Sequence, residues 1–216
     1  MNKINLLLTT ANDNLKNSKK LIEQAARTAE EYVFPKLKIN WDIDVLATNR
    51  LYNMIIPEDG VGGRTHASDF IELSINEEKA TEELAAEILV HELCHAARWG
   101  KNDEWINSLF DAIINEGIAT YFESEYVKNK KEKQFFIKTV LERSDKDNEE
   151  ILEKLRDQLD SNYYDYEAIF YHGNDNLPRW SAYSLGYYLV KKYLQKNNKT
   201  IEEAFADNYK DFRTVL

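Results

Sequence analysis

Hydrophobic and polar positions along the chain change from a helical period to strict alternation, and later return to a helical period. Leu15, Leu21 and Ile22 lie near helical spacing, which predicts a helix over residues 11–33. From Ile39 to Val45 apolar residues alternate with polar ones, and residues 70–75 alternate again. Alternation of this kind is typical of half-buried strands, so we expect two strands here.

A glycine-rich segment and two long helices follow from the same pattern. Residues 58–66 hold three of the seven glycines and are expected to form a loop. A helix is predicted over residues 81–99, with Thr81 as its N-cap and Gly100 at its C-terminal exit. A second helix is predicted over about 104–128.

The rest of the chain is predicted to be largely helical. It is highly charged from about residue 129, and a further helix is expected from Ser181 to Leu194. Thr200 and Glu203 form a capping box for a short terminal helix. Strands first and helices afterwards predict an α+β fold. We expect one domain over 1–216, with the strands in about 36–80 and the helical part in 81–216.

The charge and composition of the chain argue against some classes of binding partner. The net charge of −10 and the pI of about 5.0 argue against nucleic acid or an anionic membrane surface, because phosphate binding needs a basic face. Cys94 is the single cysteine, so no intrachain disulfide can form. The apolar run Ile4 to Leu8 is too short for a signal-peptide core, so we expect a cytoplasmic protein.

The candidate chemistry lies in the predicted helix over residues 81–99, which reads His91-Glu92-Leu93-Cys94-His95. Histidines four residues apart share one helical face, so both imidazoles can reach one metal ion. Glu92 lies about 100° around the helix from His91, beside the metal, where it can deprotonate a metal-bound water. Zinc lowers the pKa of such a water to about 7, so a carboxylate base suffices. The alternative is a helix with two partly exposed histidines.

A third ligand is expected on the following helix. Glu116 lies among Ile113, Ile114, Ile118 and Ala119, where an unpaired buried carboxylate would be costly. A metal ion would serve as its partner, although a Glu on a solvated face is the simpler alternative. Gly117 is a poor helix former and indicates close approach of another element.

These residues together give the sequence a family resemblance. The His-Glu-x-x-His motif with Asn115-Glu116-Gly117 downstream is similar to the glutamate-zincins, of which thermolysin is the best known. The stretches 91–98, 114–122 and 178–187, with the segment 62–65, resemble a bacterial family of predicted Zn-dependent proteases that began as a domain of unknown function. This resemblance implies a zincin-like fold, with a small mixed or antiparallel sheet packed on the metal-binding helix. It also implies one Zn²⁺ per chain and hydrolysis of a peptide or similar amide.

Thr120 is a departure from the thermolysin pattern, which has an Asp at this position to orient a ligand histidine. Metal-bound histidines usually donate their second N–H to an acceptor. Asp111, Thr120 or a backbone carbonyl could accept it, and the sequence does not choose.

Several residues are candidates for substrate contacts. An oxyanion needs a hydrogen-bond donor, and the resemblance favours Tyr183, followed by Tyr187; both could equally be core tyrosines. His66 and His172 are loop candidates for the same role. Phe70 begins strand 70–75, which we expect to be an edge strand able to bind an extended peptide by backbone hydrogen bonds.

The sequence therefore predicts a zinc metallopeptidase in which Glu92 activates a zinc-bound water. Two alternatives remain open. One is a zinc-dependent amide or ester hydrolase with a non-peptide substrate, and the other is a binding or regulatory protein on a zincin scaffold. The intact Glu92 argues against the second, because a structural zinc site has no need of a base.

Overall fold

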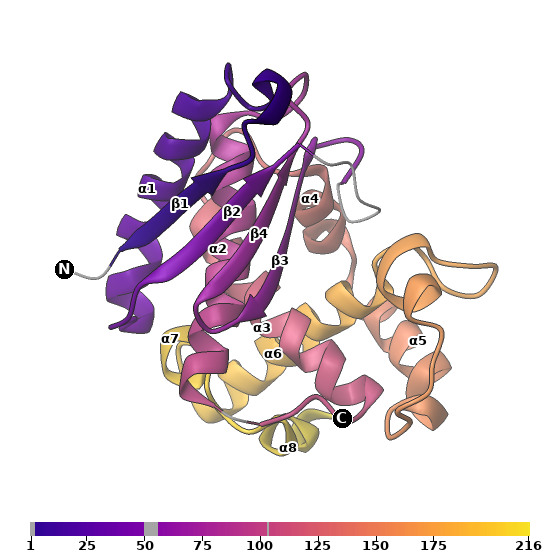
Figure 1. Cartoon of the computed structure of the whole chain (residues 1–216). Helices are drawn as coiled ribbons and strands as arrows, with labels where there is room; N and C mark the ends of the chain where they lie inside the picture. Colours follow the sequence, from indigo (N-terminus) through magenta and orange to yellow (C-terminus); the bar gives the residue numbers. More distant parts are fainter. Residues whose placement is uncertain (1–2, 50–55, 103) are drawn as a thin grey trace. The chain divides into compact units, whose positions relative to one another are not determined.

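A mixed four-stranded sheet forms the centre of the N-terminal part of the chain (Figure 1). The computed structural model describes residues 3–49, 56–102 and 104–216. These described residues fall into two units, the first within the bounds 1–101 and 125–135 and the second within 102–124 and 136–216. The prediction of one domain over 1–216 stays a prediction, and each unit is described by itself.

In the first unit the strands are β1 (Ile4–Leu8), β2 (Ile43–Thr48), β3 (Val61–Ala67) and β4 (Phe70–Ile75). Their order across the sheet is β1-β2-β4-β3. The β1–β2 and β2–β4 pairs are parallel, whereas β3 runs antiparallel to β4. The predicted α+β class is confirmed, and so is a small mixed sheet near the N-terminus.

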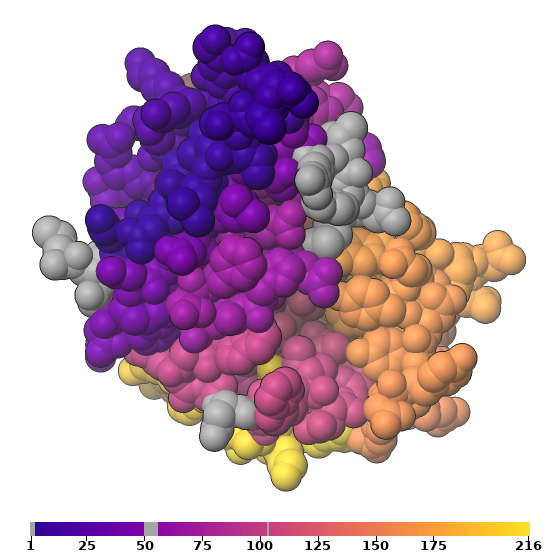
Figure 2. Space-filling model, in the orientation of Figure 1, coloured from indigo at the N-terminus to yellow at the C-terminus, as the bar shows by residue number. Residues whose placement is uncertain are grey.

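Alternation determines which residues of the sheet are buried. Val45 and Ala47 in β2, and Ile71 and Leu73 in β4, are fully buried. The residues between them point to the opposite face, where Asp44 is exposed. Figure 2 shows side chains of this opposite face forming the surface of the first unit.

Helices α1 (Lys19–Leu37) and α2 (Glu82–Lys101) pack on each other, and α2 also contacts β3 and β4. In Figure 1 both helices lie behind the sheet. The predicted N-cap of α2 is confirmed, because Thr81 Oγ1 accepts from the N–H of Leu84 at 3.2 Å. Helix α2 has residues buried on all its sides, and this is why its polar side chains need partners inside the protein.

Some predicted boundaries in the first unit were wrong. The segment 58–66 is not wholly a loop, since β3 begins at Val61 and pairs with β4 along its length. Strand β4 lies between β2 and β3, so 70–75 is an interior strand and β3 takes the edge position. The run Ile4–Leu8 is strand β1. The first helix begins at Lys19 instead of residue 11 and contains Pro35.

The second unit is built from helices, in agreement with the predicted helical C-terminal half. The longer helices with most of their residues in this unit are α3 (Leu109–Val127), α4 (Phe135–Glu142), α5 (Asp145–Leu155) and α6 (Ser181–Asn197). The segment Glu167–His172 forms a π-helical turn, and α7 (Ile201–Ala204) and α8 (Tyr209–Phe212) are short. The capping box of Thr200 and Glu203 is confirmed. The predicted helix over 104–128 begins only at Leu109, and 130–134 are not helical.

Helices α3 and α6 cross at a pair of glycines. A Cβ atom built on Gly117 would lie 2.6 Å from the Gly186 Cα, and one built on Gly186 would lie 2.8 Å from the Gly117 Cα and clash with the Ile113 carbonyl oxygen. The expectation that Gly117 marks close approach of another element is confirmed. This crossing fixes the part of α3 that carries Glu116.

We predict that Gly186→Ala destabilises the protein. The added methyl meets backbone atoms, which cannot rotate away, and overpacking costs about 1–3 kcal/mol or more. The better helix propensity of Ala offsets about 1 kcal/mol. We expect a net loss of about 1–2 kcal/mol and a Tm lower by roughly 2–8 °C, measured by thermal unfolding. Gln195→Ala, at an exposed position of the same helix, is the control; an equal Tm for both variants would contradict the glycine crossing.

No helix in the described ranges combines the length and the hydropathy required to cross a membrane.

Candidate metal centre

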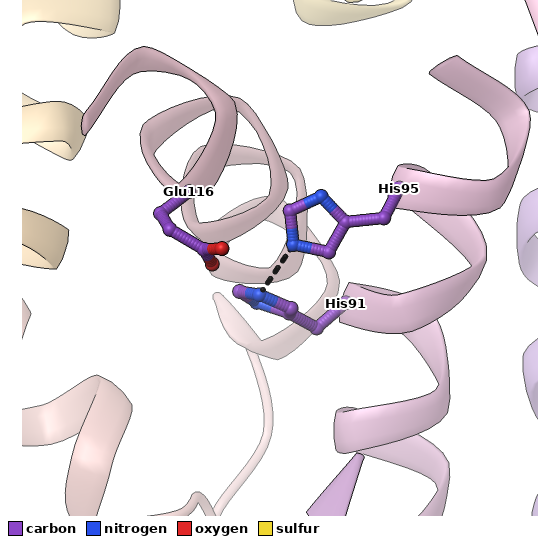
Figure 3. A group of neighbouring side chains, drawn as sticks. All are labelled: His91, His95 and Glu116. Carbon is purple, nitrogen blue, oxygen red and sulfur yellow. Dashed lines mark hydrogen bonds between the residues drawn. The ribbon is translucent and has the colours of Figure 1, made fainter. Parts of the chain in front are cut away.

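Helix α2 places His91 and His95 on successive turns of one face, as their spacing predicts (Figure 3). His91 is buried and His95 is half-buried. Their Nε2 atoms lie 3.1 Å apart, and the two rings meet edge to face. The Nε2 atoms of the two imidazoles therefore point toward the same position.

The separation of these nitrogens fits a shared zinc ion. Zinc binds imidazole nitrogen at about 2.0–2.1 Å in tetrahedral geometry, which puts two ligand nitrogens about 3.3 Å apart. The observed 3.1 Å is close to that value. A hydrogen bond between two neutral rings would also fit the distance. The third residue of the group is therefore needed to distinguish such a hydrogen bond from a shared zinc ion.

Glu116, from α3, is that third residue. One ligand atom from each of His91, His95 and Glu116 lies within 4.8 Å of the other two (Figure 3). Two imidazoles and one carboxylate are the ligand set of many catalytic zinc sites, which keep a fourth position open. The donor set therefore fits zinc.

Glu92 lies next to His91 and is only 6% exposed. Its Oε2 accepts a hydrogen bond from Thr65 Oγ1, on β3, at 2.8 Å. Gly63, two residues earlier on the same strand, leaves room for the carboxylate, because a Cβ there would lie 2.8 Å from Glu92 Oε1. The edge strand thus holds the side chain that we expect to act as the base. Thr65 was not among the residues expected at the site from the sequence.

A tyrosine cluster, defined as Tyr166, Tyr171 and Tyr183, lies near Glu116. Burial and then the negative charge of Glu116 raise the pKa of Tyr171, while the neighbouring hydroxyls of Tyr166 and Tyr183 act in the other direction. Burial and the charge of Glu116 also raise the pKa of Tyr166. These two phenols therefore stay protonated at neutral pH and can donate hydrogen bonds. Tyr171 lies in the π-helical turn and was not among the residues expected at the site from the sequence.

The other residues expected at the site lie in several places. Tyr187 is half-buried and stacks on Tyr121 with ring centroids 5.4 Å apart. His66 stacks on Phe70 at 5.2 Å, and its Nε2 lies 3.3 Å from the Glu72 carboxylate. Phe70 and Glu72 alternate with the buried residues of β4, so this group belongs to the sheet face opposite the buried one.

His172 is exposed and pairs with Glu167 at 3.4 Å. The roles of His172, His66 and Phe70 in substrate binding stay predictions.

Two residues considered as acceptors for the ligand histidines have other surroundings. Asp111 accepts a hydrogen bond from the N–H of Asn107 at 3.1 Å near the start of α3. Thr120 is fully buried, and within the described part of the chain its hydroxyl has no hydrogen-bond partner. Thr120 therefore does not replace the thermolysin Asp in this structure.

The fold and this group of residues define an α+β protein with a His-His-Glu set suited to zinc. A family model described as "Predicted Zn-dependent protease (DUF2268)" matches residues 18–214, and the chain belongs to this family. The family description would make the protein a hydrolase. No curated protein and no solved structure matches the chain.

Proposed function

We propose that the protein is a zinc metallopeptidase in which His91, His95 and Glu116 hold one zinc ion and Glu92 is the general base. The observation that carries this proposal is the convergence of two Nε2 atoms, 3.1 Å apart, with the Glu116 carboxylate. The family description supports the same chemistry. A zincin-like arrangement of the thermolysin type is part of this proposal.

The residues of the chain have distinct tasks in the proposed reaction. Zinc, when bound, supplies a Lewis acid that polarises a carbonyl and acidifies the attacking water to a pKa of about 7. Glu92 accepts a proton from that water on its carboxylate and passes it to the nitrogen of the leaving amine. Burial of Glu92 excludes bulk water from the carboxylate that makes both transfers.

A peptide is the substrate that the sheet supports best. Among the described residues β3 has β4 as its strand partner and is the last strand of the sheet on that side. Ile56 bridges to Val61 at the start of this strand, and we propose that the remainder of its outer edge, near Thr65, offers backbone N–H and C=O groups to an extended chain. The same strand carries Thr65, whose hydroxyl contacts Glu92. A peptide added along β3 would lie beside the proposed base, which favours a peptide over a compact amide or ester.

The tyrosine cluster is the proposed source of oxyanion stabilisation. Tyr183 was expected in this role, and Tyr171 joins it because the hydroxyls of these two residues are hydrogen-bonded to each other close to Glu116. We predict that Tyr171→Phe lowers kcat about 100-fold with zinc content unchanged, as expected for loss of one oxyanion donor. Tyr163→Phe, at a side chain that is 91% exposed, is the control. Equal kcat values for the two variants would remove Tyr171 from the mechanism.

Cleavage of a peptide library tests the proposed activity. We expect the zinc-loaded protein to cleave peptides, to lose this activity after chelation and to regain it when zinc is restored. Cleavage that persists after zinc is removed would contradict the proposal. A zinc-loaded protein that cleaves no peptide of the library but hydrolyses small amides or esters would support the non-peptide alternative.

A further inference from the structure

Two residues of the edge strand contact the side chain of Glu92 without being candidates for metal binding. Thr65 Oγ1 lies 2.8 Å from Glu92 Oε2 and 2.9 Å from the Glu92 backbone oxygen. A threonine hydroxyl has a single proton, so it donates to one of these oxygens at a time. The carboxylate is the stronger acceptor when it is ionised, because hydrogen bonds to charged groups are about twice as strong as neutral ones.

The two carboxylate oxygens of Glu92 have different surroundings. Oε2 is anchored by Thr65, whereas no hydrogen bond to Oε1 is formed within the described part of the chain. Oε1 and the carboxylate carbon lie 2.8 and 2.9 Å from the position that a Cβ on Gly63 would occupy. A side chain at position 63 would therefore displace the carboxylate. Thr65 therefore holds Oε2, and Oε1 is the oxygen available for proton transfer.

We propose that Thr65 is a positioning residue that fixes Glu92 through Oε2, so that Oε1 is the oxygen that takes up and passes on the proton. Gly63 is the second positioning residue, because the absence of its side chain provides the space for Oε1. This inference rests on the proposed function, since it assigns a task within the same reaction. It explains why a strand with two adjacent glycines, Gly62 and Gly63, lies against the helix that carries Glu92.

The geometry predicts which kinetic constant changes. The hydrogen bond from Thr65 orients Glu92, which acts in the chemical step, while the Thr65 hydroxyl itself has no contact with the peptide in the proposed reaction. We therefore expect its loss to lower kcat and to leave KM and zinc content unchanged. Hydrogen bonds to charged groups have a net effect that corresponds to roughly a 10- to 100-fold change in rate.

The experiment compares Thr65→Val, Thr65→Ser and Glu92→Gln in zinc-loaded, full-length protein with fluorescently labelled casein as the probe. Thr65→Val keeps the shape and β propensity of the residue but removes the hydroxyl. We expect kcat to fall about 10- to 100-fold in Thr65→Val and to stay within about threefold of wild type in Thr65→Ser. Thr10→Val, at an exposed threonine, should leave kcat unchanged.

Crystal structures of the wild type and Thr65→Val provide a readout that does not depend on activity. We expect Glu92 Oε2 on Thr65 Oγ1 in the wild type, and a carboxylate turned away from this position in the variant. The same displacement is expected in Gly63→Ala, which serves as the second variant if Thr65→Val does not fold. An unmoved Glu92 in the variant that folds would overturn the inference.

The results distinguish a failure of the positioning role from a failure of the proposed function. If Glu92→Gln abolishes casein hydrolysis while Thr65→Val keeps wild-type kcat, the positioning role is wrong and the proposed function stands. If Glu92→Gln retains hydrolysis, the proposed base is wrong and the inference falls with it. Equal losses in Thr65→Val and Thr65→Ser, accompanied by a lower Tm in both, would show a structural role and overturn the inference.

Discussion

Glu92→Gln is expected to keep about one zinc per chain and to lower kcat about 10²- to 10⁴-fold, which is the usual contribution of a general base. The amide matches the carboxylate in shape, so the packing against Gly63 and the contact with Thr65 can persist. It cannot take up a proton as a carboxylate does. Single-turnover hydrolysis of a peptide selected from a library would measure the loss, and elemental analysis would establish that the metal is retained.

Glu72→Gln is a suitable control for this change. Glu72 is a half-buried carboxylate of β4 that contacts His66 at 3.3 Å. It lies on the sheet face opposite the buried one. Its replacement should leave kcat within about twofold, since no step of the reaction uses it. Wild-type kcat in Glu92→Gln would remove Glu92 from the mechanism.

Glu116→Ala is expected to weaken zinc binding at least about 100-fold. Partners that only orient zinc ligands already contribute 10- to 100-fold in affinity, and loss of a ligand itself should cost more. The variant leaves His91 and His95, which alone do not complete the three-ligand set of a catalytic site. Competition with a chromophoric chelator at fixed pH would measure the change.

Glu125→Ala is the matched control on the same helix, because Glu125 is exposed and pairs with Lys128 at 3.5 Å. It should bind zinc as the wild type does. Unchanged affinity in Glu116→Ala would mean that the third ligand lies elsewhere in the chain.

The helical part of the candidate site could be predicted from sequence because it depends on local spacing. Two histidines four residues apart share a helix face whatever surrounds them, and the structure confirms that their Nε2 atoms converge. The cap at Thr81 and the close approach at Gly117 follow from equally local signals. The α+β class followed from the order of alternating and helical segments.

The strand β3 could not be recognised in the same way. Glycine is depleted in strands, so the pair Gly62-Gly63 favoured a loop. The structure uses Gly63 to admit the side chain of Glu92, a contact between residues 29 positions apart. A glycine inside a strand can signal close approach of another group, but only after the strand itself is recognised. Tyr171 was missed because a π-helical turn carries it, and no local pattern relates that turn to Glu116.

The central claim is that His91 and His95 hold a zinc ion, and zinc content tests it most directly. The chain has four histidines, so the double variant His66→Ala/His172→Ala is a matched control for His91→Ala/His95→Ala. Protein supplied with zinc and then dialysed should contain about one zinc per chain in the wild type and in the control, and almost none in the variant without His91 and His95. Absence of zinc from the wild type, or one zinc per chain in the His91→Ala/His95→Ala variant, would contradict the claim.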